Sequence, residues 1–458
     1  MNATNQIQYQ ADIEQLADQY GLDYYPVQFE HVPPSFMMEV AVYGLPVRMP
    51  HWSFGVRYIY QLIQHRMGHS HIFEVVVPGN PGHAYLANTN KDTENVLVTA
   101  HVLGHADFSK NNVLFRRVQE QAGYHIVEQA AGHAQRINDA IETYGQERVE
   151  QVLDAAFALE QHIEIHQDLR RPLYADQIRE QASPKPKSAF QDRYRQLPGS
   201  ELDKPSTIGD NRIAIPPRPE GDLLWFIAEY APEMAGWERD IFLAVREESF
   251  YFQPVYACQI MNEGWASYWH ARLLREADFL PQEMYVDAIK THSDVVRPYA
   301  GEQQVSLSVN PYHLGFKMWE KIIEDKGLKA AREIMSLEDD FAFIRNNLDE
   351  SLAQELGLFR YTARRGGREA TVADWDIDEI REAIVSPKYH FGAPHVNVTE
   401  LKKDGTLILT HDHETDGRGL DADSARKVLG YIHTVWRRPV ILHTINSQGR
   451  ETKISVGE

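Results

Sequence analysis

The chain has 458 residues, and its 46 Lys and Arg against 66 Asp and Glu give a formal net charge of −20. A charge of this sign repels nucleic acid and anionic lipid, so we expect no nucleic-acid partner. No stretch reaches the ~18 apolar residues of a membrane span and the N-terminus lacks the apolar core of a secretory signal, so we expect a cytoplasmic protein without membrane insertion.

The spacing of apolar residues predicts mostly helices in the N-terminal half. We expect helices at residues 11–20, at 57–65, from 93 onward, around 137–144 and at 149–163, and a short strand or hairpin at 72–77. The Pro-Gly-Asn-Pro-Gly run at 78–82 signals a turn, and Gly145 marks a break between two helices. Residues 183–218 are rich in Pro and charge and show little periodicity, which predicts a long, exposed and mobile loop.

The character of the chain changes towards its C-terminal end. Helical periodicity resumes at Asp222 and continues, with breaks, to about Arg365. Strands are then expected at 396–399, 406–410 and 439–444, around a helix at 422–435. The predicted fold is mainly α, with a large helical body that could be zincin-like and a small C-terminal α+β domain.

The predicted domain organisation has four parts. They are an N-terminal helical region (1–182), a mobile linker or loop (183–218), a second helical region that packs with the first as one domain (219–370), and the C-terminal α+β domain (371–458).

The first group of residues that could carry chemistry is His101-Val-Leu-Gly-His105. On a helix, this spacing places two imidazoles one turn apart on one face, where both could bind one ion. The pattern arises readily by chance, so a pair of packed histidines is the alternative. The only cysteine, Cys258, excludes cysteine-based sites, so a metal would need histidine and carboxylate ligands.

The second group is the run Met261-Asn-Glu-Gly-Trp-Ala-Ser-Tyr-Trp-His. It resembles the helix that supplies the glutamate zinc ligand in gluzincin aminopeptidases, where an Asn-Glu-Gly-aromatic-Ala run follows an HExxH helix. The resemblance implies that His101, His105 and Glu263 form a His₂Glu metal site with an open fourth position. The implied cofactor is a divalent metal, zinc first.

One position departs from that pattern, because Val102 stands where HExxH has the glutamate that activates water. A general base could come from Glu94, seven residues before His101, from Asp107, or from His270, seven residues after Glu263. Each of the three also has a structural interpretation. Glu94 would be a helix-start carboxylate, Asp107 a helix-end residue and His270 a core histidine.

Other clusters are interpreted as structural. His162 and His166 form a second pair four residues apart, and His133 lies on the face of Ile137, so we expect all three to pack in the core rather than join a metal site. His411-Asp-His413-Glu is expected to be an exposed turn, with weak metal binding as the alternative. The charges from Glu238 to Glu248 on an apolar helix predict a buried salt-bridge network, with an arginine that faces a cleft and holds a substrate carboxylate as the alternative.

Several longer blocks identify the family. In order, they are Pro50-His-Trp-Ser-Phe-Gly, Asn80-Pro with Ala84-Tyr-Leu-Ala-Asn, Ala100-His-Val-Leu-Gly-His-Ala-Asp-Phe with Asn111-Asn, Tyr144-Gly, Trp237-Glu-Arg-Asp-Ile, Ile260-Met-Asn-Glu-Gly-Trp-Ala-Ser and Asn310-Pro-Tyr-His-Leu-Gly-Phe. Through them the chain resembles the SpoVR (stage V sporulation protein R) family over about residues 10–450. The family is linked to spore cortex formation, yet it also occurs in bacteria without spores, often beside genes for a serine protein kinase and a von Willebrand-type protein.

Two functional hypotheses follow. The first is a metal-dependent hydrolase or acyl-transfer enzyme, in sporulation or cell-envelope (peptidoglycan) processes, that acts on a peptide or cell-wall-precursor amide. The second is a non-catalytic regulatory or scaffold protein in a stress-response complex with a serine kinase, in which the absent glutamate has abolished turnover. A bound metal with an open position and a nearby carboxylate would favour the enzyme.

Overall fold

The computed structural model describes residues 3–66, 73–123, 125–182, 215–296, 309–358, 360–363, 370–374, 376–446 and 448–457. Most of these residues are helical, which confirms the mainly α prediction. The loop predicted at 183–218 lies outside the described residues, apart from 215–218. None of the described helices combines the length and the apolar character needed to cross a membrane.

The chain divides into two compact units. Unit 1 comprises Met1–Glu150 and Glu247–Gly392, and unit 2 comprises Gln151–Arg246 and Ala393–Glu458. The boundaries between the two units differ from the domain boundaries predicted at 182, 218 and 370. Each unit combines two segments that are distant in sequence.

Unit 1 holds most of the helices. Its N-terminal elements are α1 (Ala3–Gln19), β1 (Val27–Val32), α2 (Pro34–Tyr43), α3 (Trp52–Arg66), β2 (Glu74–Val77), β3 (Gly82–Ala87), α4 (Asp92–Asn111), α5 (Val113–Ala122), α6 (Ile126–Tyr144) and the start of α7 (Gln146–Ala158). After the end of α11 (Gly236–Ala257) come α12 (Gln259–Arg275), α13 (Gln282–Val295), α14 (Pro311–Leu337), α15 (Asp340–Asn347), α16 (Glu350–Glu355), β4 (Arg360–Ala363), β5 (Ala370–Asp374), α17 (Ile377–Val385) and the 3₁₀ segment Ser386–Gly392.

A small sheet in unit 1 has the strand order β1-β3-β2. Strand β2 pairs antiparallel with β3, with Glu74 opposite Leu86, and β1 pairs parallel with β3. The strand predicted at 72–77 therefore exists, and it adds one edge of a three-stranded sheet. Its importance is positional, because β2 and β3 both contact α4.

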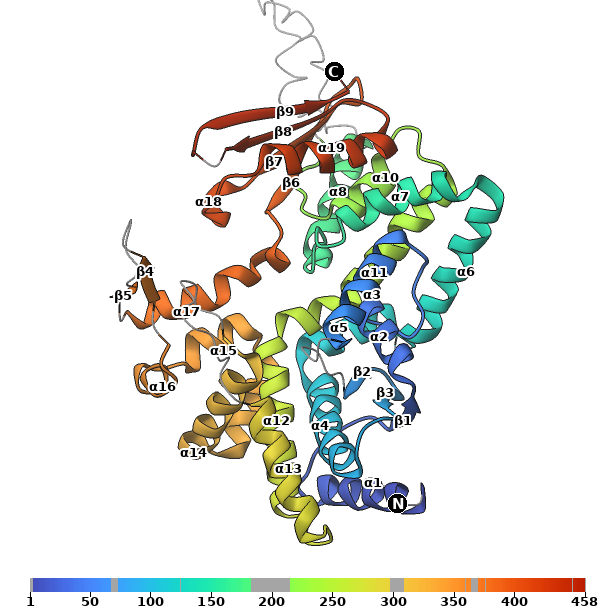
Figure 1. The fold of residues 1–458 in the computed structure, drawn as a ribbon. Coiled ribbons are helices and arrows are strands. Elements are labelled where there is room, and N and C mark those ends of the chain that lie inside the picture. Colours follow the sequence, from blue (N-terminus) through green and yellow to red (C-terminus); the bar gives the residue numbers. More distant parts are fainter. Residues whose placement is uncertain are drawn as a thin grey trace, which may run out of the picture. The chain divides into compact units, whose positions relative to one another are not determined.

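The core of unit 1 forms where α12 packs against α4 on one side and α14 on the other (Figure 1). Small residues allow these backbones to meet: a Cβ added to Gly104 would lie 2.6 Å from the Cα of Ala266, and a Cβ on Gly264 would clash with the backbone of Gly315. The close approach between Gly104 and Ala266 agrees with the small-residue pattern of the sequence. Gly264 serves a second contact, with α14.

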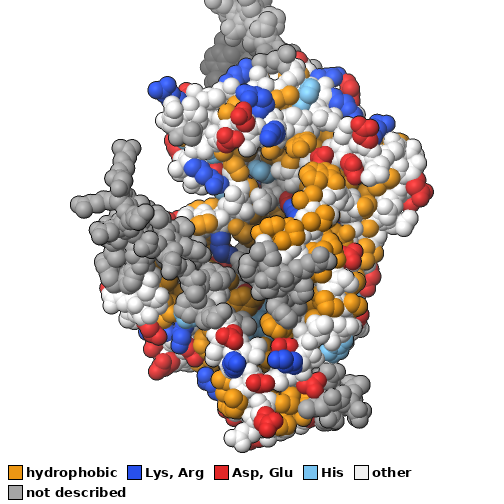
Figure 2. Space-filling view, viewed as in Figure 1, with side chains coloured by type: hydrophobic (Ala, Val, Ile, Leu, Met, Phe, Trp, Pro, Cys, Tyr) orange, Lys and Arg blue, Asp and Glu red, His pale blue; other side chains and the backbone are white. Residues whose placement is uncertain are grey.

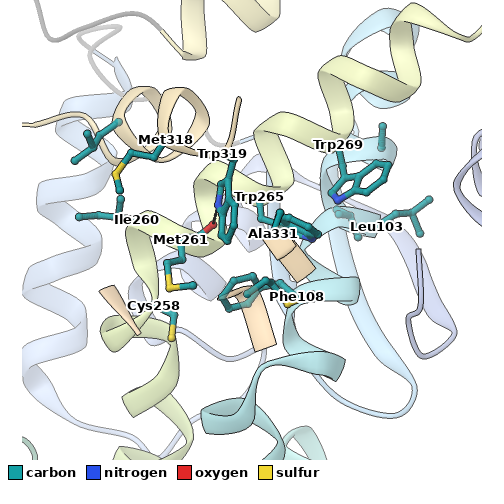
Figure 3. Packing of buried hydrophobic residues seen from close by; sticks show 14 of the residues in the cluster. Leu103, Phe108, Cys258, Ile260, Met261, Trp265, Trp269, Met318, Trp319 and Ala331 are labelled. Atoms are coloured by element: carbon teal, nitrogen blue, oxygen red, sulfur yellow. Dashed lines mark hydrogen bonds between the residues drawn. The ribbon is translucent and has the colours of Figure 1, made fainter. Parts of the chain in front are cut away.

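Aromatic side chains fill the space around these contacts. Trp265 and Trp319 are fully buried and meet edge to face, with 4.9 Å between ring centroids (Figure 3). The indole Nε1–H of Trp319 donates to the carbonyl oxygen of Met261 at 3.0 Å, so its one polar group is satisfied inside the core. Burial of these large apolar surfaces fixes the positions of α12 and α14 relative to each other.

Unit 2 contains the C-terminal sheet. Its elements are the remainder of α7, α8 (Gln167–Ala182), α10 (Leu223–Tyr230), most of α11, β6 (Val396–Leu401), β7 (Leu407–His411), α18 (His413–Asp416), α19 (Ala422–Trp436), β8 (Val440–Ile445) and β9 (Glu451–Val456). The strand order is β6-β7-β8-β9; β7 and β8 are parallel and the two outer pairs are antiparallel. The predicted strands and the helix between them are present, with α19 packed on β8 and β9 (Figure 1).

The charged residues of α11 form ion pairs, as predicted. In unit 2, Arg246 Nη2 lies 2.7 Å from Oδ2 of the fully buried Asp222, and Arg437 pairs with Glu238. In unit 1, Glu248 is fully buried and pairs with Arg48 at 2.7 Å. These carboxylates are each paired, which is the condition under which a buried charge is tolerated.

The surface of helix α3 is unusually apolar. Its exposed hydrophobic residues are Trp52, Val56, Ile59, Tyr60 and Ile63, each at least 49% exposed. They follow the spacing of one helix face. The visible face in Figure 2 likewise shows hydrophobic side chains exposed between interspersed acidic and basic ones. Contiguous exposed apolar residues of this kind are typical of interaction sites.

Candidate metal centre

Helix α4 presents the two predicted histidines. The helix begins with a carboxylate cap, in which Glu94 Oε2 accepts the backbone N–H of Lys91 at 2.7 Å. Further along α4, His101 and His105 lie one helical turn apart. Their rings meet edge to face with centroids 4.5 Å apart, and both side chains are buried. Glu94 itself lies at the helix start, seven residues and about 10 Å of axial rise before His101. The structure therefore gives it the capping role rather than a place beside the histidines.

Helix α12 supplies the carboxylate. Its first turn is held by Asp340, whose two oxygens accept the backbone N–H groups of Ile260 and Met261 at 2.9 Å each. Asp340 is fully buried and also pairs with Lys388 Nζ at 2.9 Å. Glu263 lies immediately after this anchored turn, so its position depends on a fixed helix start.

The three predicted ligands converge. Glu263 Oε2 lies 3.5 Å from Nε2 of His101 and 3.5 Å from Nε2 of His105. Among the described residues, these three form the one group of His, Cys, Asp and Glu whose ligand atoms all lie within 4.8 Å of one another. Around a zinc ion with bonds of ~2.0–2.2 Å, neighbouring tetrahedral ligands lie ~3.4 Å apart, which agrees with both observed separations.

The Nδ1 atoms of both imidazoles also have partners, at positions away from Glu263. His105 Nδ1 lies 2.9 Å from Oδ1 of Asn262, so the ring donates its Nδ1–H there and its Nε2 faces Glu263. His101 Nδ1 lies 3.0 Å from Nδ1 of His270. Outer partners of this kind fix ring orientation in metal sites. His270 thus joins the site through His101, although the sequence suggested it as a base.

One carboxylate oxygen of the cluster forms no hydrogen bond. Glu263 Oε2 is buried, and its neighbours Nε2 of His101 and Nε2 of His105, each 3.5 Å away, are too distant for good hydrogen bonds. A buried carboxylate oxygen without a partner is costly unless a cation satisfies it. The donor set of two imidazoles and one carboxylate suits zinc and other divalent first-row metals, so the residues fit the implied ion.

The charges in the cluster are strongly coupled. Burial raises the pKa of Glu263, but the His105 charge and the contacts with both imidazoles outweigh it and bring the pKa well below its usual range. For His105, burial lowers the pKa, yet the nearby Glu263 carboxylate produces a net rise. The pocket thus holds a carboxylate that remains charged and is neutralised by its partners.

A second carboxylate, Glu74 on strand β2, was not found from the sequence. Its Oε1 lies 4.0 Å from Nε2 of His101, outside the three-residue group. Burial raises the pKa of Glu74. Val102, which replaces the HExxH glutamate, is fully buried in the apolar core, so Glu74 brings a carboxylate to the pocket from the sheet instead. The one sequence signal was an acidic residue opening an otherwise apolar strand.

The carboxylate of Asp107 forms hydrogen bonds that join different parts of the core. It is fully buried, and it accepts the backbone N–H of Asp23 at 2.7 Å and the indole N–H of Trp265 at 2.8 Å. Arg332 Nη1 lies 3.5 Å away. Its oxygens are thus occupied in joining α4 to α12, which favours the structural interpretation over a role as a base.

Three further histidines that the sequence singled out, His133, His162 and His166, and His411 are not members of the ligand group. His133 pairs with Glu247 and Glu248. Since α7 ends at Ala158 and α8 begins at Gln167, His162 and His166 lie between helices, so they are not a pair on one helix face. The exposed turn predicted at 411–414 is wrong for His411, which is 2% exposed because it is the last residue of the buried strand β7. It contacts Asp416 at 2.8 Å and Thr444 at 2.9 Å.

The fold and the cluster together define a mainly helical protein with a buried two-histidine, one-carboxylate site. The profile of the family described as SpoVR like protein matches residues 2–392, and that of the SpoVR-like C-terminal domain matches residues 394–447. The chain therefore belongs to the SpoVR family. It is 28% identical to the uncharacterized protein YcgB of Escherichia coli (strain K12), over 96% of this chain and 92% of that protein. No solved structure matches the chain significantly.

Proposed function

We propose that the chain is a metal-dependent hydrolase or acyl-transfer enzyme that acts on a peptide or cell-wall-precursor amide. A divalent ion, zinc first, would be held by His101, His105 and Glu263. The observation that supports this most is Glu263 Oε2, which is buried, lacks a hydrogen-bond partner and lies 3.5 Å from two imidazole nitrogens.

Each group in the pocket has a chemical role in this proposal. The ion would supply Lewis-acid activation of a water or an amide carbonyl. Glu74, whose Oε1 lies 4.0 Å from Nε2 of His101, would accept a proton from the attacking water, which is the task of the glutamate in HExxH sites. Asn262 holds the ring of His105 through Nδ1, so that its Nε2 faces the pocket. Three protein ligands leave the ion one open position for substrate.

The proposed setting is the cytoplasm, in spore cortex or cell-envelope formation, where cell-wall precursors are the amide-containing substrates that the family resemblance suggests. A serine protein kinase and a von Willebrand-type protein are the proposed partners. Both proposals rest on the family and are separate from the chemistry of the pocket.

The second candidate is a regulatory or scaffold protein in a kinase-linked complex. The exposed apolar face of α3 favours it, because such a face is typical of partner binding. In this case the pocket would bind a metal for stability and turn over no substrate.

The test measures metal content and hydrolysis separately. Protein purified without added metal is analysed by mass spectrometry of the metal, together with Glu263→Gln and, as a control, Glu333→Gln at an exposed position of α14. We expect about one ion per chain in the wild type and the control and much less in Glu263→Gln, because glutamine keeps the shape but loses the charge. Equal metal content in all three proteins would refute the site.

Hydrolysis is then assayed with the zinc-loaded protein on a panel of peptides and peptidoglycan stem peptides, by release of free amine. Amine release that Glu263→Gln abolishes supports the enzyme. Bound metal without turnover on the panel, together with retention of a kinase partner by α3, would favour the regulatory protein.

A further inference from the structure

The C-terminal sheet of unit 2 carries a cavity that contains none of the metal-site residues. Its volume is about 430 Å³, within the range of ~300–1,000 Å³ typical of small-molecule sites. The cavity lies where the parallel strands β7 and β8 end, beside α18 (Figure 1). In open α/β sheets, ligands bind outside the carboxyl ends of the strands. Every lining residue is a threonine, a histidine, a glutamate or a lysine, so the cavity suits a polar ligand.

The register of the sheet explains why the cavity opens at this position. Ile408 of β7 and Ile441 of β8 are Cα partners and are 7% and 5% exposed, so the sheet face is covered at their level. Two residues further along, on the same face, Thr410 is half-buried and its partner His443 is exposed. Lys453 of β9 is the antiparallel partner of His443 and is also exposed. Three adjacent strands therefore present a row of hydrogen-bond donors where the cover of the sheet ends.

The ring of His411 is a fixed wall of the cavity. Its Nε2 lies 2.8 Å from Oδ2 of Asp416, and its Nδ1 lies 2.9 Å from Oγ1 of Thr444. The same oxygen of Asp416 accepts the backbone N–H of His395 at 2.7 Å. Both nitrogens of His411 are thus engaged inside the domain. Within the described parts of the chain, the lining residues form no group whose ligand atoms are close enough to share a metal ion, which argues against a metal as the ligand.

The cavity is lined by one acidic and one basic side chain of the same strand. Glu451 and Lys453 lie two residues apart on β9, so they share a face and their Cα atoms are ~6.5 Å apart. Both side chains are exposed. A simple anion would be attracted by Lys453 and repelled by Glu451, and a simple cation would meet the reverse. This pair therefore favours a ligand that itself carries one charge of each sign.

We propose that this cavity binds a small zwitterion of the class of the free α-amino acids. Lys453, His443 and the hydroxyl of Thr410 bind the ligand carboxylate, which can accept about four hydrogen bonds, and Glu451 binds the ligand ammonium. The lining contains no Trp, Tyr or Phe on which a nucleobase would stack. It also contains no Leu, Ile, Val or Met, so small polar amino acids fit it better than leucine or phenylalanine.

This inference goes beyond the proposed function and does not depend on it. All the lining residues belong to unit 2, whereas the three candidate metal ligands belong to unit 1. Zinc content and amino-acid binding are therefore measured independently, and either proposal can fail while the other holds.

The first test uses the full-length wild-type protein in calorimetric titrations with the standard L-amino acids. We expect saturable binding of small polar ones such as glycine and serine. The best ligand is then compared with its N-acetyl derivative, which lacks the ammonium, and with its carboxamide, which lacks the carboxylate charge. Each change should weaken binding at least about 10-fold, because a charged hydrogen bond is lost. Absence of binding by every amino acid, or unchanged affinity for either derivative, overturns the proposal.

Variants assign each ligand charge to its residue. Lys453→Met should weaken binding at least about 10-fold, and the carboxamide should then bind almost as well as the parent amino acid. Glu451→Gln should weaken binding similarly and make the variant insensitive to N-acetylation. The controls Lys402→Met and Glu400→Gln change exposed residues of the same domain outside the cavity, and they should bind within about twofold of the wild type. Equal losses in the controls and the cavity variants would overturn the assignment.

Inorganic phosphate distinguishes a zwitterion site from a simple anion site. Phosphate should bind more weakly than the best amino acid, because it gains nothing from Glu451. Phosphate that binds more tightly than every amino acid, with an affinity that Glu451→Gln raises, overturns the proposal in favour of an anion site.

Discussion

Gly104 on α4 and Ala266 on α12 lie in direct backbone contact: a Cβ added to Gly104 would be 2.6 Å from the Cα of Ala266. His105 follows the glycine directly, and Glu263 lies one turn before the alanine. The contact therefore sets the separation of the two helices at the position where the ligands meet, and it yields the first prediction.

Gly104→Ala should destabilise the protein by about 1–3 kcal/mol, because the added methyl overpacks the helix contact. In a helix without such a contact the same change stabilises by up to about 1 kcal/mol. Gly132→Ala in α6 is the matched control, since nothing lies within 4 Å of the added Cβ. Urea unfolding of both variants measures the difference. A stabilising effect at both positions would contradict the close approach of α4 and α12.

Glu74→Gln should lower hydrolysis without lowering the zinc content. Glu74 lies outside the three-residue ligand group, so the variant should keep about one zinc per chain. Amine release should fall by at least about 100-fold, because glutamine cannot accept the proton of the attacking water. Metal analysis and the peptide panel are run on the same protein sample. Loss of metal comparable with that of Glu263→Gln would instead show that Glu74 is a ligand.

Asp340→Asn should destabilise the protein by about 3 kcal/mol or more, since it leaves Lys388, 11% exposed, without its buried partner. It should also lower zinc content, because Asp340 holds the first turn of the helix that carries Glu263. Thermal unfolding and metal analysis measure the two effects. The double variant Asp340→Asn with Lys388→Met should recover part of the stability, and failure of any recovery would argue against the ion pair as the cause.

His133 should make stability depend on pH. Burial lowers its pKa, but hydrogen bonds to Glu247 and Glu248 dominate and raise the pKa to about 9. Arg48 also faces this cluster through Glu248. A raised pKa means that the protonated ring stabilises the folded state, fully below a pH of about 6.5, and that this contribution is lost as the pH rises through about 9.

The measurement compares the wild type with His133→Gln by urea unfolding between pH 6 and pH 10. The difference in unfolding free energy should be up to about 3 kcal/mol at pH 6 and should shrink towards pH 10. A difference that stays constant over this range would show that His133 contributes by packing alone.

Features that depend on local spacing could be predicted from the sequence alone. Two histidines four residues apart face the same way on any helix, so His101 and His105 could be paired without a structure. Short runs of apolar and β-branched residues likewise located strands β7 and β8, on either side of the predicted helix, because such residues suit the buried surfaces of a sheet. The small residues Gly104 and Ala266 indicated a close helix contact, although not the second contact of Gly264 with α14.

The distant groups that complete the site could be identified from the three-dimensional structure but not from the sequence. Glu74 reaches His101 because strand β2 pairs with β3 in a particular register and both strands contact α4, and no local period encodes that placement. His292 joins His270 through the packing of α13 beside α12. Glu94 and Asp107 had the right spacing from the histidines, yet one caps a helix and the other is bound by Asp23 and Trp265. Periodicity fixes the face of one element, whereas the assembly of a buried pocket depends on how several elements pack around a shared core.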